Sequence, residues 1–206
     1  MKPTRQQARA AGRVLSATTW PSRIAALLVL LSTLFAAYHI GREAPKEWPE
    51  RSAESGQVKR GQVVEGEVVG VADGDTITVV DADKHQYKIR LAFVDAPEKT
   101  QPHGARAKQN LSDLVYGQAV KVEIEDVDRY QRAVGHIWRN GRDVNLAQLE
   151  AGYAWHYTQY AKKKQPEAEF ERYRTAESQA RRRQQGLWSD EKPTPPWEYR
   201  RAKREK

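Results

Sequence analysis

Five short apolar segments between Gly61 and Asn140 restrict the possible folds of this chain more than any other feature of the sequence. They are rich in Val, Ile and aromatic residues, are separated by Asp, Gly and other polar residues, and cover 63–71, 77–80, 87–93, 120–124 and 134–138. Short runs of this kind, bounded by turn residues, are typical of consecutive antiparallel strands. Six Trp and nine Tyr add apolar surface for a core, although 30% of the residues are charged.

Helices are predicted between and after these strands. Apolar residues recur at helical spacing in 105–116, 144–151 and 166–185, and Gly186 closes the last of these segments. The final fifteen residues combine three prolines with a run of Arg and Lys. This composition predicts a mobile, basic tail over 191–206.

The amino-terminal region differs in composition from the rest of the chain. Residues 1–23 contain five basic and no acidic residues, and residues 24–40 carry no charge. A helix over 24–40 would be roughly 25 Å long, close to the ~30 Å apolar core of a membrane. We expect a retained transmembrane anchor, with a cleaved signal segment and secretion as the alternative. Residues 41–60 are predicted to be a linker, and the charge distribution places the following domain outside the membrane or in the periplasm.

Three acidic segments lie at predicted strand ends. Asp73–Thr76 is also explained by a hairpin turn, Asp95–Glu98 by a helix cap, and Asp126–Arg132 by a solvated hairpin with internal salt bridges. Thr100, Gln101 and Pro102 argue against the helix cap because they postpone the next helix.

Taken together, the three segments supply the groups that phosphodiester hydrolysis needs. Asp75 and Asp95 offer hard oxygen ligands for a divalent cation, and Glu98 is a candidate general base. Arg90 and Arg132 could bind a phosphate group. The sequence has no Cys, which excludes thiolate metal sites and cysteine nucleophiles, and it has no phosphate-binding loop.

At these positions the sequence resembles the thermonuclease family, whose members contain staphylococcal-nuclease-like domains. The resemblance extends from about Val63 to Trp188 and rests on ordered motifs: Asp73-Gly74-Asp75-Thr76, Arg90-Leu91-Ala92-Phe93-Val94-Asp95-Ala96-Pro97-Glu98, Asp128-Arg129-Tyr130-Gln131-Arg132 and Gly186-Leu187-Trp188. It implies a mainly β fold, a five-stranded OB-type barrel with three helices, over residues 61–190.

The resemblance also implies a calcium-dependent endonuclease that cleaves DNA and RNA. The family's metal ligands fall on Asp75, Asp95 and the main-chain carbonyl of Ala96, its general base on Glu98, and its phosphate-binding arginines on Arg90 and Arg132. Gln131 stands where the family commonly has Gly, which bears on the turn before Arg132.

Two aromatic residues are predicted to contact substrate. Tyr130 and Tyr160 could stack on a base or donate a hydrogen bond to a phosphate. For Trp155 and Tyr157, core packing is the favoured interpretation.

The net charge of +8 comes from the ends of the chain. Residues 1–23 contribute +5 and residues 192–206 contribute +4, whereas residues 24–191 carry −1. Together with the resemblance to the thermonuclease family, the sequence predicts a monomeric, membrane-anchored, calcium-dependent nuclease. The alternatives are a non-catalytic OB-type module that binds nucleic acid or a protein at the membrane, and a scaffold whose basic tail contacts lipid.

Overall fold

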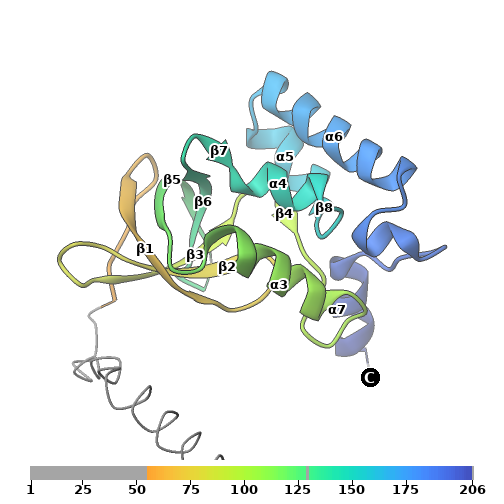
Figure 1. Cartoon of the computed structure of the whole chain (residues 1–206), viewed down its shortest axis with the longest axis horizontal. Coiled ribbons are helices and arrows are strands. Elements are labelled where there is room, and N and C mark those ends of the chain that lie inside the picture. Colours follow the sequence, from red (N-terminus) through yellow and green to blue (C-terminus); the bar gives the residue numbers. More distant parts are fainter. Residues whose placement is uncertain (1–54, 129, 206) are drawn as a thin grey trace, which may run out of the picture. The chain divides into compact units, whose positions relative to one another are not determined.

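Five strands form a closed barrel in the computed structural model, which describes residues 55–128 and 130–205 (Figure 1). The elements, in chain order, are β1 (Val63–Val71), β2 (Thr76–Val80), β3 (Gln86–Leu91), β4 (Val94–Asp95), α3 (Gly104–Val115), β5 (Ala119–Val127), β6 (Ala133–Arg139), β7 (Arg142–Asp143), α4 (Val144–Glu150), β8 (Trp155–His156), α5 (Thr158–Lys164), α6 (Glu167–Arg182), the 3₁₀ helix η2 (Gly186–Ser189) and α7 (Pro196–Arg204).

The barrel follows the order β3-β2-β1-β5-β6 and is closed by a β3–β6 pairing. Neighbouring strands within that order are antiparallel, whereas β3 and β6 run parallel, with Ile89 opposite Ala133 and Leu91 opposite Gly135. Register shifts in β1 and β5 accompany the curvature that closure needs. The predicted five-stranded barrel is therefore confirmed, and the parallel closing pair makes it a mixed barrel.

The inward-facing residues of the strands fill the barrel. The alternation seen in the sequence places one set of β-branched side chains inside, and the fully buried members include Val68, Ile77, Val79, Ile89, Val122 and Ile137. Burying a side chain of this size contributes about 1.5–3 kcal/mol. The strand pattern thus determines both the inner face and the main source of stability.

Three predicted helices are confirmed with ends shifted by a few residues. Helix α3 buries Ala107, Leu111 and Val115, which recur at helical spacing. Helix α4 begins after Asp143, whose side chain accepts a hydrogen bond from the Leu146 N–H as an N-cap. The structure describes five α-helices in residues 55–128 and 130–205, because α5 and α7 add to the three expected.

The predicted mobile tail is wrong for residues 196–204, which form helix α7. Pro196 occupies the first turn, where its fixed φ angle favours a helix. Basic residues occupy the last turn, where they interact favourably with the negative end of the helix dipole. Trp197 packs with its ring centroid 5.6 Å from that of Trp155 and 5.6 Å from that of Tyr157. The prolines that suggested a tail therefore lead into a docked helix.

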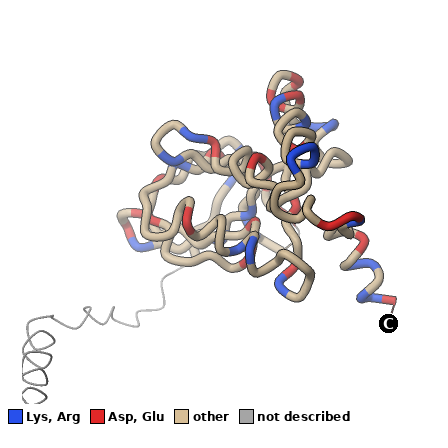
Figure 2. Tube along the Cα trace, turned by 45° about the vertical axis from the view of Figure 1, so that its right-hand side comes forward, with Lys and Arg blue, Asp and Glu red and all other residues tan. Residues whose placement is uncertain are grey.

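The predicted leader (1–23) and membrane helix (24–40), together with most of the predicted linker (41–60), lie outside the described residues. Within residues 55–128 and 130–205, every helix is too short or too polar to span a membrane. Figure 2 shows Lys and Arg interspersed with Asp and Glu along the described trace, as expected for a nearly neutral domain.

Candidate active site

The loop between β1 and β2 is held tightly against the loop after β4 and against α3. A Cβ atom on Gly74 would lie 2.7 Å from the Cβ of Ala107 and 2.7 Å from the Cβ of Ala96. Only glycine fits this approach without a shift of the backbone. The carbonyl oxygen of Gly74 also accepts a hydrogen bond from Gln148 Nε2 at 2.6 Å. This packing brings the adjacent Asp75 within hydrogen-bond distance of the Ala96 N–H.

Asp75 and Asp95 are joined by one guanidinium group. Arg90 Nη1 donates to Asp75 Oδ1 at 2.9 Å, and Arg90 Nη2 donates to Asp95 Oδ1 at 2.7 Å. The two acidic residues are only 3% and 0% exposed. The second oxygen of Asp75 accepts the Ala96 N–H at 3.0 Å. The structure therefore brings together four residues predicted from the sequence: Asp75, Arg90, Asp95 and Ala96.

Burial and the neighbouring charges shift the pKa values of this cluster. Burial raises the pKa of Asp75, the nearby Asp73 raises it further, and Arg90 opposes both effects without reversing them. Burial alone would lower the pKa of Arg90, but Asp75 and Asp95 raise it above its ordinary value. Perturbed pKa values of this kind are common where protein groups are arranged for catalysis or for binding a cation.

Glu98 lies beyond β4 in the loop before α3, as the sequence predicted. Its main-chain N–H donates to Gln101 Oε1 at 3.2 Å, and helix α3 begins only at Gly104. The Glu98 side chain is 39% exposed, so water can reach its carboxylate. This position, next to a buried pair of carboxylates, suits a general base.

Arg200 of α7 is the site residue that the sequence did not predict. Its Nη1 donates to Glu98 Oε1 at 2.9 Å and to Asp95 Oδ1 at 3.1 Å, and its Nη2 donates to Asp95 Oδ2 at 2.7 Å. These hydrogen bonds raise the pKa of Arg200, and the bonds to Asp95 have the largest effect. The helical spacing of residues after Pro196 was the sequence signal that could have predicted α7. A short run of charged residues and prolines is equally typical of an unstructured tail.

Arg132 is held by Asp128 at the β5–β6 junction. Arg132 Nε and Nη2 lie 2.7 and 2.6 Å from Asp128 Oδ2, and the other oxygen of Asp128 accepts the main-chain N–H of Arg132 at 3.0 Å. Although burial alone would raise the pKa of Asp128, these hydrogen bonds lower it. The predicted hairpin salt bridge is therefore present.

The barrel closure places Arg132 near Arg90 without joining it to the carboxylates. Arg132 immediately precedes Ala133, which is opposite Ile89 in the parallel pair. One strand spacing and two residues along the strand correspond to roughly 8 Å between the Cα atoms of Arg90 and Arg132. Gln131, just before Arg132, has a φ of 60°, a left-handed conformation that glycine adopts more readily.

The two predicted substrate-contacting tyrosines lie in different environments. Tyr130 is an exposed turn residue, and the guanidinium carbon of Arg132 lies 5.5 Å from its ring centroid. Tyr160 is partly buried, donates to Asp126 Oδ2 at 2.9 Å and packs against Phe93. Tyr130 is thus placed to meet a ligand near Arg132. Trp155 is buried, which confirms its predicted packing role.

Two further clusters of ligand-type side chains serve the fold. Asp81 and His85 pair across the β2–β3 turn, with Asp83 nearby. His136, Asp143 and Glu169 also lie close together, but Asp143 caps α4 and accepts the Tyr173 hydroxyl, while His136 pairs with Glu169. The contacts of both clusters are explained by local structure.

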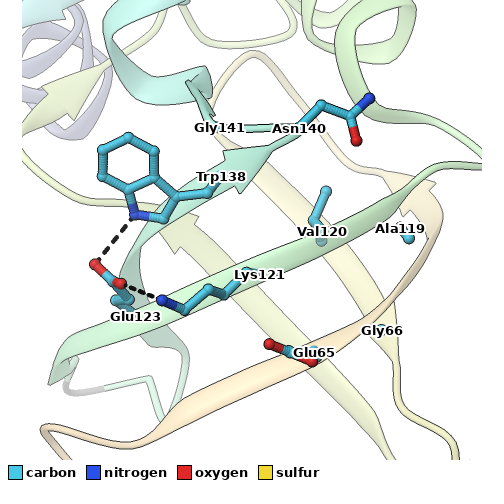
Figure 3. Close-up of a pocket in the computed structure, with 9 residues that line it drawn as sticks. All are labelled: Glu65, Gly66, Ala119, Val120, Lys121, Glu123, Trp138, Asn140 and Gly141. Carbon is cyan, nitrogen blue, oxygen red and sulfur yellow. Dashed lines mark hydrogen bonds and ion pairs between the residues drawn. The ribbon is translucent and has the colours of Figure 1, made fainter.

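A hollow of about 580 Å³ lies on the outside of the barrel over β1, β5 and β6 (Figure 3). The Trp138 indole N–H and Lys121 both bond to Glu123 there. The residues that line it do not include the carboxylate cluster. The hollow is therefore separate from the candidate active site.

Comparison with known proteins gives concordant matches. The sequence profile described as staphylococcal nuclease homologue matches residues 88–190. Protein ParB of Escherichia coli is 40% identical over 145 residues, covering 66% of this chain and 78% of that protein. A micrococcal nuclease of Shigella flexneri is 40% identical over 146 residues, covering 66% and 80%. An uncharacterized endonuclease of Haemophilus influenzae is 36% identical over 137 residues, covering 66% and 73%.

Proposed function

This chain belongs to the staphylococcal nuclease family and is a thermonuclease-like hydrolase, and we propose that it is a calcium-dependent endonuclease acting on DNA and RNA. The observation that carries the proposal is the pairing of two buried carboxylates, Asp75 and Asp95, with one arginine, and the position of Glu98 three residues after Asp95. Binding a nucleic acid needs phosphate-binding cations but not this set of acids.

The donors in this cluster fit a calcium ion. Asp75, Asp95 and the main-chain carbonyl of Ala96 would hold it, because hard oxygen donors are the ligands that calcium prefers. The guanidinium groups that pair with both carboxylates support this assignment, because they are positive groups at the same oxygen atoms. When bound, the ion supplies positive charge that stabilises the phosphate oxygens in the transition state.

The chain's own residues account for the proton transfer and for substrate positioning. Glu98 accepts a proton from the water that attacks phosphorus, and it is exposed enough for that water to reach it. Arg90 is fixed by its two carboxylate partners and presents its guanidinium group to the phosphate. Arg132 neutralises the charge that develops on the phosphate oxygens. By resemblance to the family, the bond to the 5′ oxygen breaks and a 3′-phosphate remains.

Of the two tyrosines, Tyr130 is proposed to contact the substrate beside Arg132. Tyr130 is exposed and next to that arginine, so it can stack on a base. The Tyr160 hydroxyl is engaged with Asp126, which favours a role in orienting the turn before Arg132.

The experiment is a cleavage assay with the purified full-length protein. Supercoiled DNA and a single-stranded RNA should be degraded with calcium, and chelation should stop both reactions. Asp95→Asn should reduce calcium binding and cleavage together, whereas Asp113→Asn, on the outer part of α3, should change neither. DNA binding without cleavage at saturating calcium would select the non-catalytic module instead.

We also propose that the protein is a monomer anchored by residues 24–40, with the catalytic domain outside the membrane. The uncharged run after a purely basic leader supports this proposal. The mass of the mature protein from a membrane fraction would test it: a mass lacking the first forty residues would replace the anchor with a cleaved signal segment.

A further inference from the structure

Helix α7 is docked on the end of β4 and the loop that follows it, which contain Asp95 and Glu98 (Figure 1). Besides the Arg200 contacts, the Tyr199 hydroxyl lies 3.0 Å from Thr100 Oγ1 and donates to the Thr100 carbonyl at 3.1 Å. Gln101 Nε2 donates to the Thr194 carbonyl at 2.6 Å, just before the helix. The end of the chain is therefore fixed at several points to the segment between β4 and α3.

Arg200 uses the same oxygen atoms that a cation and a water molecule would need. A carboxylate oxygen has two lone pairs, and Asp95 Oδ1 already accepts one bond from Arg90 and one from Arg200. Asp95 Oδ2 and Glu98 Oε1 each accept a further Arg200 N–H. A calcium ion at Asp95 would be a third cation there, and both Arg90 and Arg200 would repel it.

We propose that α7 is an autoinhibitory strap, in which Arg200 occupies the carboxylates of the active site and must leave before calcium binds there. This inference rests on the proposed function, because it takes Asp95 as a metal ligand and Glu98 as the general base. Calcium and α7 then exclude each other, and the enzyme is active when the helix is released.

The packing of α7 is light enough for such a release. Pro196 is its one buried residue within the described chain, and Trp197 is only partly buried where it packs against the cluster that contains Trp155 and Trp188. Nine residues are too few for a stable helix on their own. Released residues 196–204 should therefore lose their helical hydrogen bonds, and they carry a net positive charge that favours contact with a nucleic acid.

Calcium binding to the full-length protein provides the first test. Isothermal titration should be performed with the wild type, with Arg200→Ala, and with Arg201→Ala as a control of equal net charge on the exposed side of α7. Arg200→Ala should bind calcium about tenfold to a hundredfold more tightly, the range expected from losing hydrogen bonds between charged groups. Arg201→Ala should bind like the wild type.

Hydrogen exchange separates a strap from a simple charge effect. In the wild type, amides of residues 196–204 should lose protection when calcium is added, and in Arg200→Ala they should have little protection at any calcium concentration. Equal calcium affinity of Arg200→Ala and wild type would overturn the strap. The strap would also be overturned if Arg200→Ala binds calcium more tightly while calcium leaves the amide protection of residues 196–204 in the wild type unchanged. Arg200 would then act only as a nearby charge.

The same data distinguish the two proposals. If every variant binds calcium equally and cleaves DNA, the strap fails and the calcium-dependent nuclease stands. If no variant binds calcium, the calcium dependence fails, and the strap fails with it.

Discussion

Replacing Arg90 by methionine tests whether the buried carboxylates depend on it. The substitution keeps much of the apolar stem of the side chain and removes both ion pairs, at 2.9 Å to Asp75 and 2.7 Å to Asp95. Breaking a buried ion pair from one side costs about 3–5 kcal/mol because a charge is left without a partner. Arg90 is 21% exposed, and Arg200 still pairs with Asp95, so the lower end, about 3 kcal/mol, applies.

Urea unfolding at pH 7 measures this loss. In a thermal melt of a chain of this length, a loss of about 3 kcal/mol corresponds to a decrease of roughly 6–12 °C in Tm. Arg174→Met is the matched control, because its pair with Glu171 is exposed and should contribute nothing measurable. If Arg90→Met unfolds with a free energy within about 1 kcal/mol of the wild type, the buried carboxylates do not depend on this arginine.

The loss of unfolding free energy in Arg90→Met should depend on pH. Burial already raises the pKa of Asp75 above 3.8, and loss of Arg90 should raise it further. The penalty of burying an ionised Asp75 is then full above the folded pKa and disappears as the pH falls through it toward 3.8. The deficit should therefore shrink on acidification; a deficit that is constant with pH would refute the electrostatic cause.

Three further predictions concern other parts of the fold. Gln131→Gly should stabilise the protein by about 0.5–1 kcal/mol, because the relief of a left-handed strain of about 1–2 kcal/mol exceeds the roughly 0.5–1 kcal/mol lost to the greater unfolded-state entropy of glycine; Gln131→Ala should show no gain in the same urea assay. Burial lowers the pKa of His156 below 6.5, so the unfolded chain binds its proton first and stability should fall as the pH drops below 6.5, by up to about 1.4 kcal/mol per pH unit. His156→Gln should lose that part of the slope in a series of thermal melts, and an unchanged slope would assign it to other groups. Asn145 bonds the Ile137 N–H and the carbonyls of Ala92 and Gly135 at 3.1 Å each, so Asn145→Ala should cost about 2–4 kcal/mol by urea unfolding, and a loss below about 1 kcal/mol would show that water replaces these bonds.

The local parts of the fold could be predicted from sequence because their signals are local. Alternating apolar residues gave the strands, and helical spacing gave α3, α4 and α6. The parallel β3–β6 pair joins residues more than forty positions apart, and no local pattern specifies its direction. The closure of the barrel is visible only when the inward faces are packed together.

The candidate site was predictable to a similar extent. Asp75, Arg90 and Asp95 stand at strand ends that the topology brings together, so their chemistry could be inferred from the motifs. Arg200 could not, because it reaches Asp95 across 105 residues from a segment whose prolines and charges resemble a tail. Arg132 stays with Asp128, four residues away, since that ion pair forms within its own turn.

The kinetic effect of Glu98→Gln tests the central claim most directly. This substitution keeps the oxygen that accepts the Arg200 bond and removes the ability to take a proton from water. With saturating calcium, kcat for DNA cleavage should fall by about 10²–10⁴, the contribution of a general base, while calcium affinity stays within a few-fold of the wild type. Glu171→Gln, an exposed acid on α6, should cleave at the wild-type rate. A kcat for Glu98→Gln within about tenfold of the wild type would contradict the account, since the proton would then be taken by another group.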